Sequence, residues 1–166
     1  MSEIDRSTAS LWDRPDGLGL VATAAVFAGA AVVLNGILFA SGLAGDDDAV
    51  ARLWWAPPGW AIGTIWALLF VLYAVAHWLL RQRGDSGRRA ARWVLAIVLW
   101  DLAYPFLTLG FDLVLGAWLN VVTLVLTILL LWRVWRDSRR AFGWLLPSLA
   151  WVSFATVLTF AALQQS

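Results

Sequence analysis

The sequence alternates between long apolar blocks and short polar connections. Five blocks approach the about 20 apolar residues that a helix needs to cross a bilayer, and they lie at 17–41, 60–80, 93–109, 116–135 and 142–163. Because only helices and closed barrels satisfy their backbone hydrogen bonds inside lipid, the pattern predicts an all-α membrane protein, a bundle of five transmembrane helices. We expect one domain over 17–163, preceded by a polar lead-in over 1–16 that lacks the basic start of a signal peptide.

Composition places almost the whole domain inside the membrane. The chain is 61% hydrophobic, whereas soluble domains average about 45–50% apolar residues. It has no cysteine, which excludes disulfides, thiolate metal sites and cysteine nucleophiles. It also has no lysine, and its arginines cluster at predicted helix ends, where their ordinary role is to set topology. We therefore expect the lipid bilayer as a partner and no binding of nucleic acid.

The arginines predict an orientation. Five helices place the N-terminus and the second and fourth connections on one side, which then holds eleven of the 12 arginines, whereas the other side holds Arg52. Basic residues are enriched in cytoplasmic loops. We expect a cytoplasmic N-terminus and an outward-facing C-terminus, in the cytoplasmic (inner) membrane of a bacterium.

The stretch from Trp54 to Trp66 is the most unusual in the chain, because it carries four tryptophans around Pro57 and Pro58. Proline cannot continue a helix but is well suited to its first positions, so the second helix should begin near Gly59. The tryptophans have two interpretations. They form an interfacial aromatic belt, or they form a lid over a flat apolar ligand.

Polar side chains inside the predicted helices mark a second candidate region. Asp101 lies roughly ten residues into the third helix, about 15 Å deep and near the midplane. A carboxylate there is costly and by default functional. It should face the bundle interior and either pair with a donor or be neutral. Tyr104 lies one turn further on. Asn120 opens a polar stripe with Thr123 and Thr127, which should pack against other helices.

Three further features have ordinary explanations. His77 is the only histidine and is expected at the interface, in solvent, rather than as a haem ligand. Consecutive carboxylates at 46–48 indicate a solvated surface, because calcium loops space their oxygen ligands, and we expect no metal site. Ala25 and Gly29 have the spacing that lets helices approach closely, so they should pack inside the bundle or, alternatively, form a dimer face.

Two motifs resemble those of one family. The loop from Trp55 to Trp66 is similar to the Trp-x-Pro-Pro-x-Trp-x-x-x-x-x-Trp signature of the tryptophan-rich sensory protein / translocator protein (TspO/MBR) family. The segment from Pro147 to Leu158 is similar to its Pro-Tyr-Leu-x-Trp-x-x-Phe-Ala-Thr-x-Leu segment. With five predicted helices and 13 tryptophans, the resemblance covers nearly the whole chain.

The resemblance implies a protein that binds porphyrins or related tetrapyrroles, in a pocket among the first, second, fourth and fifth helices and under the first loop. Trp66 and Trp151 would be pocket tryptophans, and the Trp55 to Trp60 segment would form the lid. The candidate ligand-binding residues are Trp55, Pro57, Pro58, Trp60, Trp66, Phe70, Asp101, Tyr104, Asn120, Trp151, Phe154, Ala155 and Leu158.

The chain departs from the family pattern at several polar positions. It carries Phe70, Asp101, Tyr104, Ser148 and Thr159 where the family has tyrosine, asparagine, tryptophan, tyrosine and asparagine. The C-terminal motif associated with sterols is absent, so sterol binding is not expected.

The function expected from these observations is tetrapyrrole binding, of porphyrin or haem, in sensing, sequestration or transport, with no obligatory cofactor. Porphyrin propionates could meet Arg52. One alternative is a structural or regulatory subunit of a larger membrane complex, such as a photosynthetic pigment-protein assembly. A second is light-dependent porphyrin degradation, although the sequence offers no nucleophile–base pair and thus no catalytic residue. A proton-driven transporter that uses Asp101 is a third.

Overall fold

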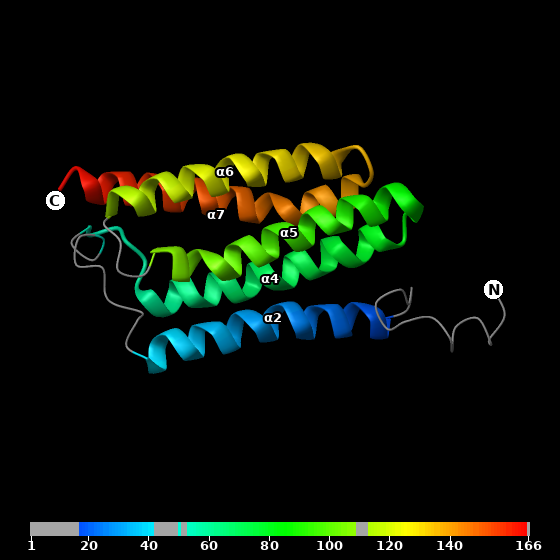
Figure 1. Ribbon diagram of the computed structural model, residues 1–166, viewed down its shortest axis with the longest axis horizontal. Helices are drawn as coiled ribbons and strands as arrows, with labels where there is room; N and C mark the ends of the chain where they lie inside the picture. The colour runs from blue at the N-terminus through cyan, green and yellow to red at the C-terminus, as the bar shows by residue number, and fades with distance from the viewer. Residues whose placement is uncertain (1–16, 42–49, 51–52, 109–112, 166) are drawn as a thin grey trace.

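The computed structural model describes residues 17–41, 50, 53–108 and 113–165 (Figure 1). These residues form five helices, namely α2 (Gly17–Ala40), α4 (Gly59–Arg81), α5 (Gly84–Thr108), α6 (Leu113–Trp135) and α7 (Arg139–Leu163). Each is long and apolar enough to cross a membrane, so the predicted five-helix membrane fold is confirmed. The lead-in 1–16, the carboxylates 46–48 and Arg52 lie outside the described residues.

The helix starts follow local backbone chemistry. α4 begins at Gly59 as predicted, because Pro58 precedes it in an extended conformation (φ −64°, ψ 151°). α5 begins at Gly84 rather than at residue 93, since Gly84 adopts a φ of 67° that turns the chain sharply after α4. α7 begins at Arg139 rather than at residue 142, because the Ser138 hydroxyl accepts a hydrogen bond from the amide of Ala141.

The five helices run side by side along the long axis of the molecule (Figure 1). α4 packs against α2, α5 and α7, and α6 packs against α5 and α7. α2 forms an outer edge, because it contacts α4 and has only a narrow contact with α5. The seam between α2 and α5 is therefore the least tightly closed side of the bundle.

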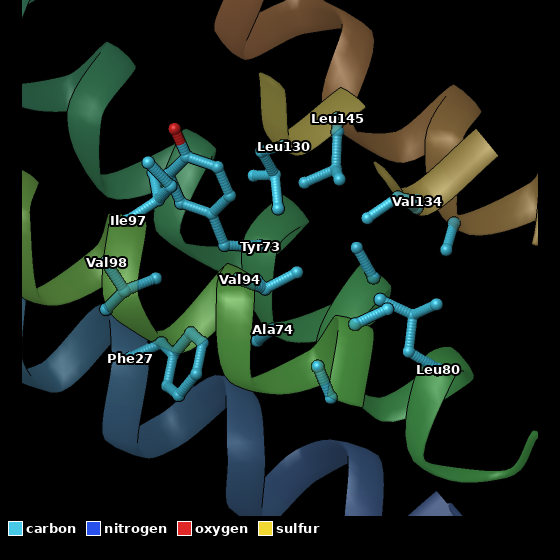
Figure 2. Close-up of a cluster of buried hydrophobic side chains, with 14 of the residues drawn as sticks. Phe27, Tyr73, Ala74, Leu80, Val94, Ile97, Val98, Leu130, Val134 and Leu145 are labelled. Carbon is cyan, nitrogen blue, oxygen red and sulfur yellow. The ribbon is translucent and has the colours of Figure 1, made fainter. Parts of the chain in front are cut away.

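The core is built from small, branched and aromatic side chains of all five helices. Figure 2 shows Phe27, Tyr73, Ala74, Leu80, Val94, Ile97, Val98, Leu130, Val134 and Leu145 packed together. Lipid is as apolar as these side chains, so close packing rather than water exclusion holds such helices together. Many large aliphatic side chains instead point outward, such as Val21, Val33 and Val157, which are more than half exposed. This exterior suits contact with lipid.

The first helix packs through a different face from the one predicted. Thr23, Phe27 and Ala31 follow one another at four-residue spacing and are buried against the bundle. Ala25 is exposed, and a Cβ added at Gly29 would meet nothing within 4 Å. The prediction that this pair packs inside the bundle is therefore wrong, because it lies on the outer side of α2. Its alternative use as a dimer face stays a prediction.

Two turns meet at one end of the bundle, which we call the arginine end because Arg81, Arg83, Arg88, Arg89, Arg92, Arg133, Arg136, Arg139 and Arg140 lie in or near these turns. Asp137, after α6, accepts hydrogen bonds from the Ser86 hydroxyl and from the Arg133 guanidinium. The α4–α5 turn is thereby fastened to the α6–α7 turn. The opposite end, which we call the loop end, holds the residues that lead into α4 and the end of α7 (Figure 1).

Candidate functional site

A cavity of about 50 Å³ lies between α2, α4 and α5. Four predicted site residues, Trp66, Phe70, Asp101 and Tyr104, line it. The other lining residues are Ala31, Leu34, Asn35, Leu102 and Pro105. The fold thus brings together side chains that are up to 74 positions apart in the sequence, from Ala31 to Pro105, at the seam where α2 is least tightly joined to α5.

The size of the cavity limits what it can hold. Pockets that bury a drug-sized ligand measure about 300–1,000 Å³, whereas one water occupies about 30 Å³ of the liquid. The cavity of about 50 Å³ therefore suits water or one small polar group. A tetrapyrrole would have to widen it. The cavity also lies among the first three helices, whereas the family resemblance implied the first, second, fourth and fifth.

Asp101 is the most unusual group at this cavity. Its side chain is 5% exposed, and neither carboxylate oxygen has a hydrogen-bond partner among the described residues. The buried Tyr73 hydroxyl interacts electrostatically with it, but no hydrogen bond of normal geometry joins them. Buried polar groups are normally satisfied, and an ionisable group inside a membrane is by default a functional one. Asp101 is thus placed to receive a hydrogen-bond donor.

The distance of Asp101 from the start of its helix differs from the prediction. Since α5 begins at Gly84, Asp101 lies about 25 Å along the helix at a rise of about 1.5 Å per residue. That is about 10 Å from the end of the helix at Thr108. It is also about 8 Å from the middle of α5, so the carboxylate lies nearer to the middle of the helix than to its end, although it is further along the helix than predicted because the helix starts earlier than its apolar pattern suggested.

An aromatic ladder on α4 leads from the cavity into the core. The rings of Trp66 and Phe70 lie 6.3 Å apart, and those of Phe70 and Tyr73 lie 6.0 Å apart, both edge to face. Tyr73 was not among the predicted site residues, although its spacing from Trp66 and Phe70 places it on the same helical face. Asn35 was also missed. The signal for it was a carboxamide inside an otherwise apolar span.

A second aromatic group joins the loop to α7. Trp151 stacks on Phe154 at 5.5 Å, and Trp55 meets the same ring edge-on at 5.8 Å. Leu158 lies in the apolar cluster beneath them. The buried Trp151 Nε1 has no acceptor among the described residues. Trp55 is therefore packed inward as a lid residue would be, whereas Trp54 is 94% exposed, as an interfacial residue would be.

The remaining loop residues lie at the start of α4. Pro57 is half-buried, Pro58 precedes the helix, and Trp60 is 73% exposed. Ala155 is half-buried on α7, and its carbonyl accepts a hydrogen bond from Thr159. None of these four lines the cavity. The structure therefore gathers eight of the predicted residues into two groups rather than a single pocket: Trp66, Phe70, Asp101 and Tyr104 at the cavity, and Trp55, Trp151, Phe154 and Leu158 around the Phe154 ring.

Asn120 joins helices to one another. Its Oδ1 accepts a hydrogen bond from Tyr104, and its Nδ2 donates to Thr159. Thr123 and Thr127 are buried, and Thr123 accepts a bond of 2.8 Å from Trp100 Nε1. The prediction that this stripe packs against other helices is confirmed. Both polar atoms of the Asn120 carboxamide are therefore hydrogen-bonded to side chains of other helices.

The prediction for His77 is wrong. Its side chain is 7% exposed, and its ring lies 5.4 Å from that of Phe27. The histidine is buried because α2 packs over this face of α4, which its position near the helix end did not reveal. Among the described residues, no three His, Asp or Glu side chains come together in a group that could hold a metal ion.

Comparisons with known proteins agree with the resemblance seen in the sequence. The TspO/MBR family matches residues 21–164. The chain is 29% identical over 109 residues to the uncharacterized membrane protein YtaB of Bacillus subtilis (strain 168), an alignment of 64% of this chain and 70% of that protein. It is 28% identical over 116 residues to the tryptophan-rich protein TspO of Bacillus cereus (strain ATCC 14579), covering 68% and 75%. The matched range includes most of α2 and all of α4 to α7.

Proposed function

Because this chain belongs to the TspO/MBR family of membrane proteins, we propose that it binds a tetrapyrrole, a porphyrin or haem, within the bilayer. Sensing, sequestration and transport are the roles that such binding would serve. The proposal rests on the family and on the chemistry of the two aromatic groups described above.

One observation supports it most directly. Trp151 presents a buried indole N–H that finds no acceptor in the described part of the chain, and its ring stacks on Phe154, which Trp55 borders. A tetrapyrrole is a flat aromatic with acceptor atoms, so it can stack on these rings and accept that N–H. Each aromatic pair adds about 0.5–1.5 kcal/mol beyond the burial of its area. The arrangement provides both interactions at one place.

Binding requires the bundle to open. The cavity of about 50 Å³ has to widen several-fold to accept a ring of that size. α2 is the helix that can move with the least loss of packing, because its contact with α5 is narrow. We propose that the ligand enters at this seam, beside the aromatic ladder on α4, and reaches the Trp151–Phe154 group on α7, which packs against α4.

We further propose that the protein lies in the cytoplasmic membrane of a bacterium, with its arginine end in the cytoplasm. The described arginines support this orientation, since nine of them belong to the α4–α5 and α6–α7 turns or their flanking helix ends.

A titration tests the function. Detergent-purified protein is titrated in the dark with protoporphyrin IX while tryptophan fluorescence is followed. The parent should show saturable quenching, and Trp151→Phe should weaken binding about five- to thirtyfold, from the loss of one hydrogen bond and part of one stacking contact. Trp66→Phe should weaken porphyrin binding less, because the Trp66 ring borders the cavity but does not supply the indole N–H that donates to the ligand.

Trp144→Phe is the matched control, because Trp144 lies on the same helix and is 46% exposed. It should bind like the parent. Linear, non-saturating quenching that is equal in all four proteins would mean that porphyrin only partitions into detergent. The search would then move to partner proteins in native membrane extracts.

A further inference from the structure

Two adjoining surface hollows lie at the arginine end of α5. One, of about 370 Å³, is lined by Arg81, Asp85, Arg88, Arg89 and Arg92. The other, of about 360 Å³, is lined by Arg89, Arg92, Trp93 and Ala96. Because Arg89 and Arg92 line both, the two hollows adjoin, and together we call them the groove, which is charged at the helix end and apolar further along the helix.

The charged hollow has a strong excess of positive charge. Its lining has four guanidinium groups and one carboxylate, that of Asp85. Asp85 is already paired with Arg88, at 2.6 Å. Arginine binds phosphate well, because its planar fork of N–H groups matches two phosphate oxygens. The hollow is therefore suited to a phosphate, held chiefly by Arg89 and Arg92.

The apolar hollow continues along the same helical face. Arg89, Trp93 and Ala96 are spaced so that they share one side of α5, and Ala96 lies about 10 Å along the helix from Arg89. Trp93 is 49% exposed and forms one wall, and the small exposed side chain of Ala96 leaves a notch beside it. Leu99, 57% exposed, continues this face toward the membrane centre.

The other turn at this end is organised differently. The guanidinium groups of Arg136 and Arg139 lie over the rings of Trp132 and Trp135, at 4.2 and 3.9 Å from the ring centroids. These cations are engaged by their own aromatic neighbours, whereas Arg89 and Arg92 line a groove. If all these arginines only set the orientation of the protein in the membrane, this difference between the two turns would have no explanation.

We propose that this face of α5 binds one anionic phospholipid. Arg89 and Arg92 hold its phosphate at the membrane surface, and one acyl chain lies in the notch at Ala96 against Trp93. A free phosphate would use the charged hollow but gain nothing from the apolar one. The adjacency of the charged and apolar hollows therefore favours an amphipathic ligand whose charged and apolar parts are about 10 Å apart.

The test measures lipid binding by the full chain in a neutral detergent, by native mass spectrometry and by the shift of the thermal midpoint. The lipids are dioleoyl phosphatidylglycerol and dioleoyl phosphatidylcholine. The parent should bind phosphatidylglycerol preferentially. The double variant Arg89→Gln/Arg92→Gln should bind it about thirtyfold more weakly, at about fivefold for each basic residue near an anionic headgroup.

Arg83→Gln/Arg140→Gln is the matched control, because it removes two exposed arginines of the same end that line neither hollow. It should bind phosphatidylglycerol within about twofold of the parent. Arg89→Lys/Arg92→Lys, which keeps the charge, should restore most of the binding. Ala96→Phe, which fills the notch and leaves the arginines in place, should weaken phosphatidylglycerol binding by several-fold.

Three results would overturn the proposal. Equal loss in both double glutamine variants would mean that the whole basic end attracts anionic lipid without a site. Equal stabilisation by phosphatidylglycerol and phosphatidylcholine would remove the role of the charge. Stabilisation by inorganic phosphate, at the same concentration and with the same dependence on Arg89 and Arg92, would identify a soluble anion as the ligand.

Discussion

The Tyr104 hydroxyl on α5 donates a hydrogen bond of 2.9 Å to Asn120 Oδ1 on α6. Asn120 Nδ2 in turn donates a bond of 2.8 Å to Thr159 Oγ1 on α7. One carboxamide thus holds three helices together through both of its polar atoms. Because Tyr104 also borders the cavity, this network fixes one wall of the candidate site.

Asn120→Leu should therefore destabilise the fold by about 1–2 kcal/mol, since interhelical hydrogen bonds in membranes contribute about 0.6 kcal/mol each on average and up to about 1.7. Tyr104→Phe should cost less, because Asn120 keeps its bond to Thr159. Thr156→Val is the control, since the Thr156 hydroxyl bonds to Val152 of its own helix. The measurement is unfolding in mixed micelles, and equal effects of Asn120→Leu and Thr156→Val would refute the role of the network.

Asp101→Asn should increase stability. The buried carboxylate has no hydrogen-bond partner in the described part of the chain, and burial of an unsatisfied polar group is unfavourable. A neutral carboxamide is less costly to bury and offers an N–H to the Tyr73 hydroxyl, so we expect a gain of about 1 kcal/mol. Unfolding in mixed micelles is again the measurement, with the exposed Asp85→Asn as a control that should change little.

The same variant separates stability from function. If Asp101 is kept for a ligand donor, Asp101→Asn should also bind protoporphyrin IX differently from the parent in the fluorescence titration. A clear loss of stability in Asp101→Asn would show instead that the carboxylate has a strong partner in the membrane, and the functional interpretation of its burial would fail.

The helices were predictable because lipid imposes a simple rule on the sequence. Each spanning block had to be apolar over its length, and Pro57 and Pro58 marked the start of α4. The start of α5 was not predictable in this way. Its first turns carry Asp85 and several arginines, so this part of the helix lies outside the apolar block. An apolar block indicates which residues contact lipid, but not where the helix begins.

The site was predictable only in part, for a related reason. Spacing on one helix showed that Trp66 and Phe70 share a face, and intramembrane polarity singled out Asp101. Neither signal says which helix lies opposite. The burial of His77 by α2 and the engagement of Asn120 between Tyr104 and Thr159 depend on that pairing of helices, so they became visible only in the structure.

Gly87→Ala should destabilise the protein by about 1–3 kcal/mol through overpacking. A Cβ at this position would overlap the carbonyl oxygen of Leu80 and the Cβ of Arg83, where α5 turns back against the end of α4. Gly143→Ala is the matched control, since nothing lies within 4 Å of its added Cβ. It should be neutral or stabilising by up to about 1 kcal/mol. Thermal unfolding of both variants checks this, and equal midpoints would show that the turn can relax.

Asp137→Ala should destabilise the arginine end by about 2 kcal/mol, because hydrogen bonds to charged groups contribute about 1.5–3 kcal/mol. The variant removes the acceptor for both Ser86 and Arg133, and the Asp137 side chain is only 9% exposed. Ser86→Ala should cost less, since the ion pair with Arg133 remains.

Hydrogen exchange distinguishes this fastening from a local effect on α6. Asp137 bonds to Ser86, which is 51 positions away in the sequence, and so joins the two turns. Asp137→Ala should therefore speed amide exchange in the α4–α5 turn as well as in the α6–α7 turn. Asp85→Ala breaks an exposed ion pair within one helix and should affect only the start of α5. Faster exchange confined to the α6–α7 turn in Asp137→Ala would mean that the two turns are held in place independently, and that the groove at Arg89 and Arg92 does not depend on this contact for its shape.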